Sequence, residues 1–160
     1  MAVCGNIVCA IAHGKAVVEK KRRRELRETK QRIKTKSQWT KEAQAAVNAW
    51  VRWRDRLLPC ISCPKPATWS GQWHASHYRS TGAHPELRFE EVNIHKACSV
   101  CNGHRSGNLI DYRIGLLDRI GPERVAQLEG PHQPKRYTID DLREIRDTYR
   151  AKLREAKKSA

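Results

Sequence analysis

Two short segments, Cys60-Ile-Ser-Cys63 and Cys98-Ser-Val-Cys101, decide the fold of this chain. Each contains two cysteines separated by two residues, and 34 residues lie between the two segments. A Cys-x2-Cys turn lets two thiolates bind one metal ion, and two such turns complete a tetrahedral site. Two redox-active or buried cysteine pairs are the alternative, but they leave the shared spacing unexplained. We therefore predict one structural zinc ion, held by Cys60, Cys63, Cys98 and Cys101.

The rest of the chain is strongly basic. It has 160 residues, with 32 Lys and Arg against 17 Asp and Glu, which gives a net charge of +15. A surplus of this size favours a polyanionic partner, and we expect nucleic acid, although small basic proteins without such a ligand also exist. No stretch of the sequence approaches the roughly 20 apolar residues of a membrane helix. No secretory signal is recognisable either, so we expect a cytoplasmic protein that does not bind membranes.

The pattern of residues divides the chain into three regions. Residues 1–38 form a basic arm, in which residues 15–36 carry eleven Lys and Arg against three Glu. We expect this arm to be helical, because its residues have high helix propensity. Residues 39–130 contain the cysteine turns and are expected to form the core with one flanking helix. Residues 131–160 are expected to form a linker and a C-terminal helix, which opens at a capping box of Thr138 and Asp141.

Within the core region, helical periodicity predicts a helix that is capped by Thr40 and stopped by Pro59. Its tryptophans have a spacing that suits core burial better than base stacking. The stretch Ala67 to Tyr78 is the strongest hairpin candidate, with Ser70-Gly71 at the turn. A further helix is expected to start near Cys101 or Asn102 and to bury the following apolar residues: Leu109, Ile110, Ile114, Leu117 and Ile120.

Polar residues with catalytic potential crowd the loop that the cysteines close. A zinc ion held by four thiolates has no open position for a substrate water, so the chemistry is expected beside the zinc. The order of a Cys-x2-Cys turn, a histidine on a hairpin, an asparagine, a second Cys-x2-Cys turn and an asparagine is typical of zinc-stapled HNH-type nucleases. We therefore predict an α+β fold with a small ββα-metal core, flanked by helices and a basic N-terminal helical arm.

Phosphodiester hydrolysis requires an activated water and neutralisation of charge on the phosphate, and four residues suit these tasks. His77 is the candidate general base, because imidazole titrates near neutral pH. Asn102 supplies an oxygen ligand of the kind that Mg²⁺ prefers. Asn93, or a backbone carbonyl, is the candidate group to orient the other ring nitrogen of His77. Arg79 is expected to bind the scissile or a neighbouring phosphate through its guanidinium fork.

Further nucleic-acid contacts are expected from basic and polar side chains in two places. One group follows the second cysteine turn and the other lies on the basic arm. Together with Arg79 they are His104, Arg105, Asn108, Arg22, Arg23 and Arg24.

Four stretches carry a family resemblance: CISC at Cys60, HYRSTGAHPELRF from His77, NIHKACSVCN from Asn93, and SGN followed by YRIGLLDRIG. With them the chain resembles the NinG/Rap family of lambdoid phage recombination nucleases, from about Trp39 to the C-terminal helix. The resemblance implies a His-Me finger (HNH) fold, Mg²⁺ dependence, and cutting of branched DNA such as Holliday junctions and D-loops. It also implies a phage or prophage protein acting in the bacterial cytoplasm during recombination.

One departure from the family pattern lies at the catalytic turn. Family members resemble Asp-Ala-Gly-His-Tyr-Arg, whereas this chain has His74 three residues before His77. His74 is then the candidate second contact of the catalytic ion, but imidazole is a poor Mg²⁺ ligand. Slower cutting, a preference for Mn²⁺ and loss of activity are the alternatives. The family also tends to carry a second cysteine-rich motif before the basic helix, of which this chain has only Cys4 and Cys9, so we assign no second zinc.

The leading hypothesis is thus a metal-dependent DNA endonuclease, with no small-molecule cofactor. A homodimer would match a two-fold symmetric junction, with the helix around Trp50 or the C-terminal helix as interface. The alternatives are a catalytically degenerate zinc-dependent nucleic-acid-binding protein and an HNH-like nuclease directed to RNA.

Overall fold

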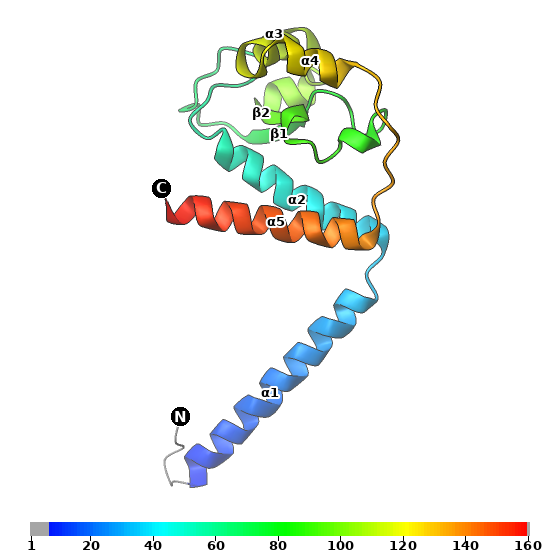
Figure 1. Ribbon diagram of the computed structural model, residues 1–160. Coiled ribbons are helices and arrows are strands. Elements are labelled where there is room, and N and C mark those ends of the chain that lie inside the picture. The colour runs from blue at the N-terminus through cyan, green and yellow to red at the C-terminus, as the bar shows by residue number, and fades with distance from the viewer. Residues whose placement is uncertain (1–6, 160) are drawn as a thin grey trace. The chain divides into compact units, whose positions relative to one another are not determined.

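A computed structural model describes residues 7–159 and divides the chain into two units, residues 1–38 and residues 39–160 (Figure 1). The larger unit combines helices with one two-stranded sheet, so this is a mixed helical protein with a small sheet. Its C-terminal helix packs within the same unit as the cysteine turns. No helix among the described residues is long and apolar enough to cross a membrane.

The N-terminal unit contains helix α1 (Ile7–Arg32), which has no buried residue. Ion pairs one turn apart join Glu19 to Arg23 at 2.8 Å and Arg24 to Glu28 at 2.7 Å. Such pairs offset part of the repulsion between the basic side chains on the helix surface. Because α1 buries nothing, it depends on these local contacts and on helix propensity rather than on a core.

Helix α2 (Lys36–Arg54) begins and ends earlier than its sequence pattern predicts. Its first turn is closed by Thr35 and Gln38: the Gln38 Oε1 atom accepts from the Thr35 amide at 2.8 Å, and Thr35 Oγ1 accepts from the Gln38 amide at 3.3 Å. This reciprocal capping box replaces the predicted cap at Thr40, which lies inside the helix. At the other end, the helix stops at Arg54 rather than at Pro59. Tighter turns follow it, in which the Arg56 amide donates to the Trp53 carbonyl at 3.2 Å and the Leu58 amide to the Asp55 carbonyl at 2.9 Å.

The sheet pairs two strands that are distant in sequence. Strand β1 (Trp73–His77) runs antiparallel to β2 (Ile94–Cys98), with Trp73 opposite Cys98 and His77 opposite Ile94. The predicted hairpin over Ala67–Tyr78 is therefore wrong. All five residues of β2 are buried, and burying this strand against β1 outweighs the local turn signal of Ser70-Gly71.

Helices α2 and α5 (Ile139–Lys158) lie side by side and share one hydrophobic core with β2 (Figure 1). The predicted capping box of α5 is confirmed, because Thr138 Oγ1 accepts from the Asp141 amide and the Asp141 carboxylate accepts from the Thr138 amide. The buried members of this core come from α2, the loop before β2, β2 and the C-terminal region: Trp39, Ala43, Ala46, Val47, Val51, Phe89, Ile94, Tyr137, Leu142 and Tyr149.

A second core surrounds the cysteine turns and includes helices α3 (Leu109–Ile120) and α4 (Pro122–Glu129). The helix expected from Asn102 onward is interrupted, since a π-helical turn at Val100–His104 is followed by left-handed residues at Ser106 and Asn108. The buried face of α3 also differs from the prediction: Tyr112 and Leu116 are buried. The Tyr112 hydroxyl explains this choice, because it donates to the Ser76 carbonyl at 2.7 Å and accepts from the His95 amide. Of the five predicted residues, Leu109, Ile110 and Ile114 are exposed, whereas Leu117 and Ile120 are half-buried and pack against this core.

Candidate metal centre and catalytic site

The four cysteines of the two turns come together as predicted. Their sulfur atoms all lie within 4.8 Å of one another, and three of the four residues are buried. Zinc–sulfur bonds of about 2.3 Å place the sulfurs of a tetrahedral site roughly 3.8 Å apart, and the Sγ atoms of Cys63 and Cys98 are separated by 3.8 Å. The donor set and its dimensions therefore fit a structural metal such as zinc. Cys9 is exposed on α1, and Cys4 lies outside the described residues.

Backbone hydrogen bonds support these sulfur atoms. The Cys98 amide donates to Cys60 Sγ at 3.2 Å and the Cys101 amide donates to Cys98 Sγ at 3.4 Å. Such contacts orient thiolate ligands and reduce their negative charge. The cluster joins the loop at residues 60–63 to the end of β2 and to the π-helical turn. It therefore fixes the position of the backbone at Asn102, the residue after Cys101.

His77 lies at the end of β1, and its Nε2 atom is 3.0 Å from the carbonyl oxygen of Arg88. Because a carbonyl can only accept, this contact places the proton on Nε2 and leaves Nδ1 as an acceptor. Burial lowers the pKa of His77 below its ordinary value of 6.5. The hydrogen bond to the Arg88 carbonyl raises this pKa and the charge of Arg88 lowers it, but burial is the largest effect. The imidazole is therefore neutral at neutral pH.

Asn93 is fully buried and holds the loop that carries this carbonyl. Its Oδ1 atom accepts from the Arg79 amide at 2.7 Å, while Nδ2 donates to the carbonyls of Arg79 and Leu87, both at 3.1 Å. Of the two groups considered for orienting His77, the Arg88 carbonyl is the one that contacts the ring among the described residues. Asn93 does not contact the His77 ring in this way. It holds both ends of the segment between residues 79 and 87, which leads directly to Arg88.

His74 and Asn102 lie against each other. The amide nitrogen of Asn102 is 3.0 Å from Nδ1 of His74, which joins β1 to the turn after Cys101. If the ring nitrogen accepts, the amide oxygen of Asn102 is free for another ligand. Side chains alternate along a strand, so His74 and His77 belong to opposite faces of β1, and no described hydrogen bond links the two contacts.

A network that the sequence did not indicate surrounds the residue after His77. The Tyr78 hydroxyl donates to Glu129, which also accepts from Arg113 at 2.7 and 3.1 Å. Burial and the Glu129 carboxylate raise the pKa of Tyr78 to about 12, and hydrogen bonds from Arg113 and Tyr78 lower the pKa of Glu129 to about 2. Glu129 and Arg113 lie on separate helices far along the chain, and no local motif marks them.

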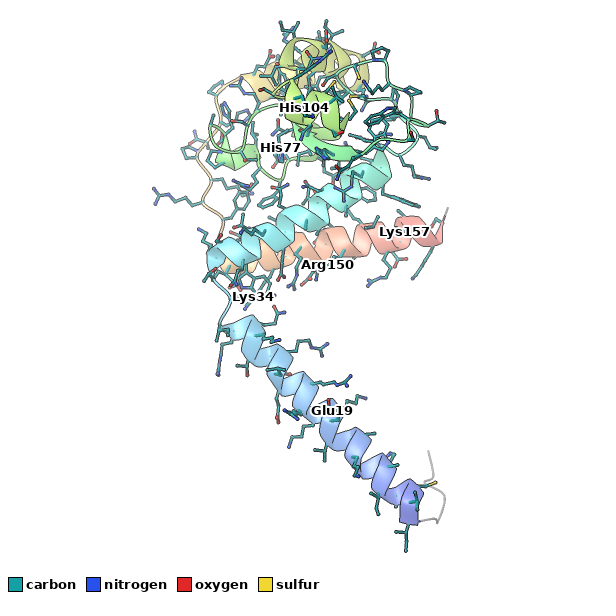
Figure 2. The ribbon with its side chains drawn as sticks, turned by 180° about the vertical axis from the view of Figure 1, so that it is seen from behind. Glu19, Lys34, His77, His104, Arg150 and Lys157 are labelled. Carbon is teal, nitrogen blue, oxygen red and sulfur yellow. The ribbon has the colours of Figure 1, made fainter. Side chains whose placement is uncertain are left out.

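The other predicted nucleic-acid contacts lie in different environments. Arg79 is half-buried. The Asn108 amide already has partners within the chain, since it donates to the Ser62 carbonyl at 2.8 Å and to Asp111 at 2.7 Å. The remaining residues are exposed: they are His104 at the end of the π-helical turn, Arg105 directly after it, and Arg22, Arg23 and Arg24 on α1. Figure 2 labels His77 and His104 in the larger unit.

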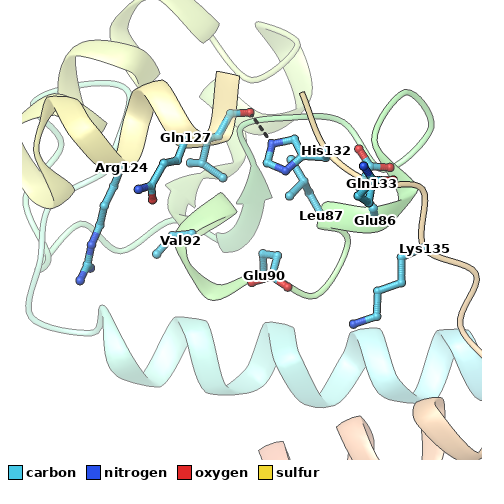
Figure 3. Close-up of a pocket in the computed structure, with 10 residues that line it drawn as sticks. Glu86, Leu87, Glu90, Val92, Arg124, Gln127, His132, Gln133 and Lys135 are labelled. Carbon is cyan, nitrogen blue, oxygen red and sulfur yellow. Dashed lines mark hydrogen bonds between the residues drawn. The ribbon is translucent and has the colours of Figure 1, made fainter. Parts of the chain in front are cut away.

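A cavity of about 360 Å³ opens beside the loop that contacts His77, between this loop, α4 and the segment after α4 (Figure 3). Its charged lining is mixed: it contains Glu86 and Glu90 as well as Arg124 and Lys135. His132 is held in place by the Leu128 carbonyl at 3.2 Å. With opposite charges side by side, the cavity presents no single sign of charge to a ligand.

Comparisons with known proteins agree with the family resemblance. The family model described as Bacteriophage Lambda NinG protein matches residues 10–159. Over 127 residues the chain is 51% identical to protein ninG of Escherichia phage 933W and of Escherichia phage lambda, and 50% identical to that of Salmonella phage P22. These matches cover 79% of this chain but only 61–62% of the phage proteins, so the chain spans less than two thirds of their length. No solved structure matches. The chain belongs to the NinG family.

Proposed function

We propose that this protein is a metal-dependent DNA endonuclease with an HNH-like centre, which hydrolyses phosphodiester bonds in branched recombination intermediates. The observation that carries this proposal is the state of His77. A neutral imidazole, fixed through Nε2 by a backbone carbonyl, has its second nitrogen available to accept a proton. Such an arrangement is what a general base for water activation requires.

The divalent ion of the proposed reaction would be held by Asn102, with His74 beside it. Bound there, it would neutralise charge on the phosphate and stabilise the leaving oxygen. An amide oxygen fits Mg²⁺, whereas an imidazole nitrogen fits Mn²⁺ better. The donor set therefore supports Mn²⁺ at least as well as Mg²⁺. A zinc ion held by the four cysteines would serve this site by fixing the π-helical turn that carries Asn102.

Charge supports DNA as the substrate class. The net charge is +15, and α1 exposes all its basic side chains because it buries no residue. Lys and Arg contacts to phosphates supply affinity without reading sequence, which suits recognition of DNA shape. The preference for Holliday junctions and D-loops rests on the family resemblance. A homodimer is part of the proposal, although Trp50 already donates to Glu91 within its own chain at 3.0 Å.

Cleavage of a labelled four-way junction by the zinc-loaded protein, beside a matched linear duplex, tests this function with Mg²⁺, with Mn²⁺ and with neither ion added. We expect metal-dependent cutting of the junction, and a loss of at least about 100-fold in His77→Ala, the typical contribution of a general base. His13→Ala changes an exposed histidine on α1 and is the matched control. Tight junction binding with no cutting in any metal would instead identify a degenerate nuclease that acts as a binding protein.

A further inference from the structure

A second cleft, separate from the His77 and Asn102 contacts, lies where the end of α2 meets α3 and α4. It encloses about 460 Å³. Three arginines from three helices line it, and they are Arg54, Arg119 and Arg124. The acidic groups that line it are Asp55 and Glu91. The net charge that the cleft offers to a ligand depends on how far these two carboxylates are already paired with cations of the chain.

Asp55 is committed to one of the arginines. Arg54 binds it through two nitrogens at 2.7 and 3.0 Å, and the backbone amide of Lys96 donates to it at 3.0 Å. Burial would raise the pKa of Asp55, but these contacts lower it overall, so it is a buried carboxylate anion. Arg54 also donates to the carbonyls of Glu91 and Ile94, so four of its five N–H donors are used within the chain.

The negative charge of Glu91 is likewise compensated, by groups that do not line the cleft. Its carboxylate accepts from Lys152 and Tyr149 on α5 and from the Trp50 indole. His95, on the floor of the cleft, does not change this balance at neutral pH, since burial and the charge of Arg54 lower its pKa to about 4.

Arg119 is left with an incomplete set of partners. Its Nη2 atom donates to the Pro59 carbonyl at 2.7 Å, but Nη1 is buried and makes no hydrogen bond to any described residue. The nearest carboxylate oxygen, on Asp55, is 3.9 Å away, which is too long for a hydrogen bond. A buried guanidinium nitrogen without an acceptor is uncommon in folded proteins and indicates a partner outside the chain, such as a water or an anion.

Arg124 stands at the rim of this cleft and is exposed. Arg124 also lines the neighbouring cavity, and Figure 3 shows its side chain extending from α4 toward α2. The cleft therefore has a buried, under-compensated cation on its wall and a solvent-exposed cation at its mouth. Each guanidinium presents several donors in a planar fork.

We infer that this cleft binds a phosphate group between Arg119 and Arg124. Tetrahedral phosphate oxygens can accept from two guanidinium forks that approach from different helices, and arginine is the side chain best suited to such recognition. Two sources can supply the group: a phosphodiester of bound DNA at a distance from the bond to be cut, or a free phosphate compound. The inference does not depend on whether the protein cleaves DNA.

The test uses the full, zinc-loaded chain in buffer without Mg²⁺ or Mn²⁺, so that the structural site stays filled and no metal-dependent cleavage occurs. In one arm, inorganic phosphate is titrated into isotope-labelled protein at constant ionic strength, and the arginine Nε–Hε NMR signals are followed. We expect saturable shifts of the Arg119 and Arg124 signals, but not of Arg136, which is an exposed arginine after α4. In the other arm, the affinity for a four-way DNA junction is measured against salt concentration for wild type, Arg124→Gln and Arg136→Gln.

For a phosphodiester in the cleft, Arg124→Gln lowers the salt slope by about 0.9, which corresponds to roughly eightfold weaker binding at 0.1 M salt. Arg136→Gln removes the same charge and is expected to change the slope less. Saturable phosphate shifts with unchanged DNA affinity would assign the cleft to a free phosphate compound. Unmoved NMR signals together with equal effects of the two substitutions would overturn the inference. Because Arg124 is exposed, its replacement does not threaten the fold, whereas Arg119→Gln would require a check of thermal stability.

Discussion

Replacing Asn93 with alanine tests whether the loop between β1 and β2 is held as the structure indicates. Asn93 is fully buried, and its side chain makes three hydrogen bonds to the backbone of Arg79 and Leu87. Alanine removes all three and leaves one amide and two carbonyls without these partners. The affected loop also carries the Arg88 carbonyl that fixes His77.

The expected cost follows from the number of lost contacts. A hydrogen bond contributes about 1 kcal/mol net, so three give a loss of roughly 3 kcal/mol in the free energy of unfolding. For a chain of this length, about 1 kcal/mol shifts the midpoint of thermal unfolding by roughly 2–4 °C. Asn93→Ala should therefore lower Tm by about 6–12 °C, which differential scanning calorimetry of the zinc-loaded protein can measure.

Asn102→Ala provides the contrast. Asn102 is only partly buried and makes a single hydrogen bond, to His74, among the described residues. Its replacement should leave Tm within about 2 °C of wild type while weakening metal-dependent cutting. A wild-type Tm for Asn93→Ala, or an equal loss in both variants, would refute the assignment of Asn93 as the residue that holds the loop.

Three further outcomes are expected. Cys98→Ser should reduce bound zinc below one ion per chain and unfold the second core, as metal analysis and circular dichroism would show, because metal binding at such sites supplies folding free energy. The pKa of His95 is about 4 in the folded protein against about 6.5 when unfolded, so the unfolded chain binds the extra proton first; stability should fall by about 3 kcal/mol as pH drops from about 6.5 to 4, and denaturant unfolding of His95→Gln should show a flatter profile. In His74→Asp, Mg²⁺ should support cleavage better relative to Mn²⁺ than it does in the wild type, and Mg²⁺ should bind more tightly in calorimetry. Unchanged binding of both ions would argue against a metal ion beside residue 74.

Features encoded in a few neighbouring residues could be predicted from the sequence. The Cys-x2-Cys turns and the capping box of α5 each depend on a spacing of three residues, and both are present. The pairing of β1 with β2 could not be found in this way, because a loop of 16 residues separates the strands and the local turn at Ser70-Gly71 offers a competing signal. Long-range burial of β2 decides between them.

The buried polar residues show a second limit of sequence patterns. Apolar periodicity favours Leu109, Ile110 and Ile114 as the buried face of α3. The structure instead buries the face that carries Tyr112, whose hydroxyl donates to a backbone carbonyl of β1. Likewise, the sequence proposes Asn93 as a partner of His77, but its amide satisfies backbone groups of the loop. A polar side chain can reach several partners, and only the folded chain determines which one is within range.

The two halves of the candidate site are positioned by different means. His77 depends on the loop held by Asn93, whereas Asn102 depends on the cysteine cluster that ends one residue before it. His74 is the only described hydrogen-bond partner of the Asn102 side chain. The aspartate of the family pattern and the histidine of this chain differ in charge, but both can accept a hydrogen bond from the Asn102 amide. Either side chain therefore preserves the contact that orients the Asn102 oxygen. In the proposed metal site, an aspartate would supply a hard oxygen ligand and His74 would supply a nitrogen ligand. On this proposal, the residue at position 74 affects which metal ion is favoured more than it affects the orientation of Asn102.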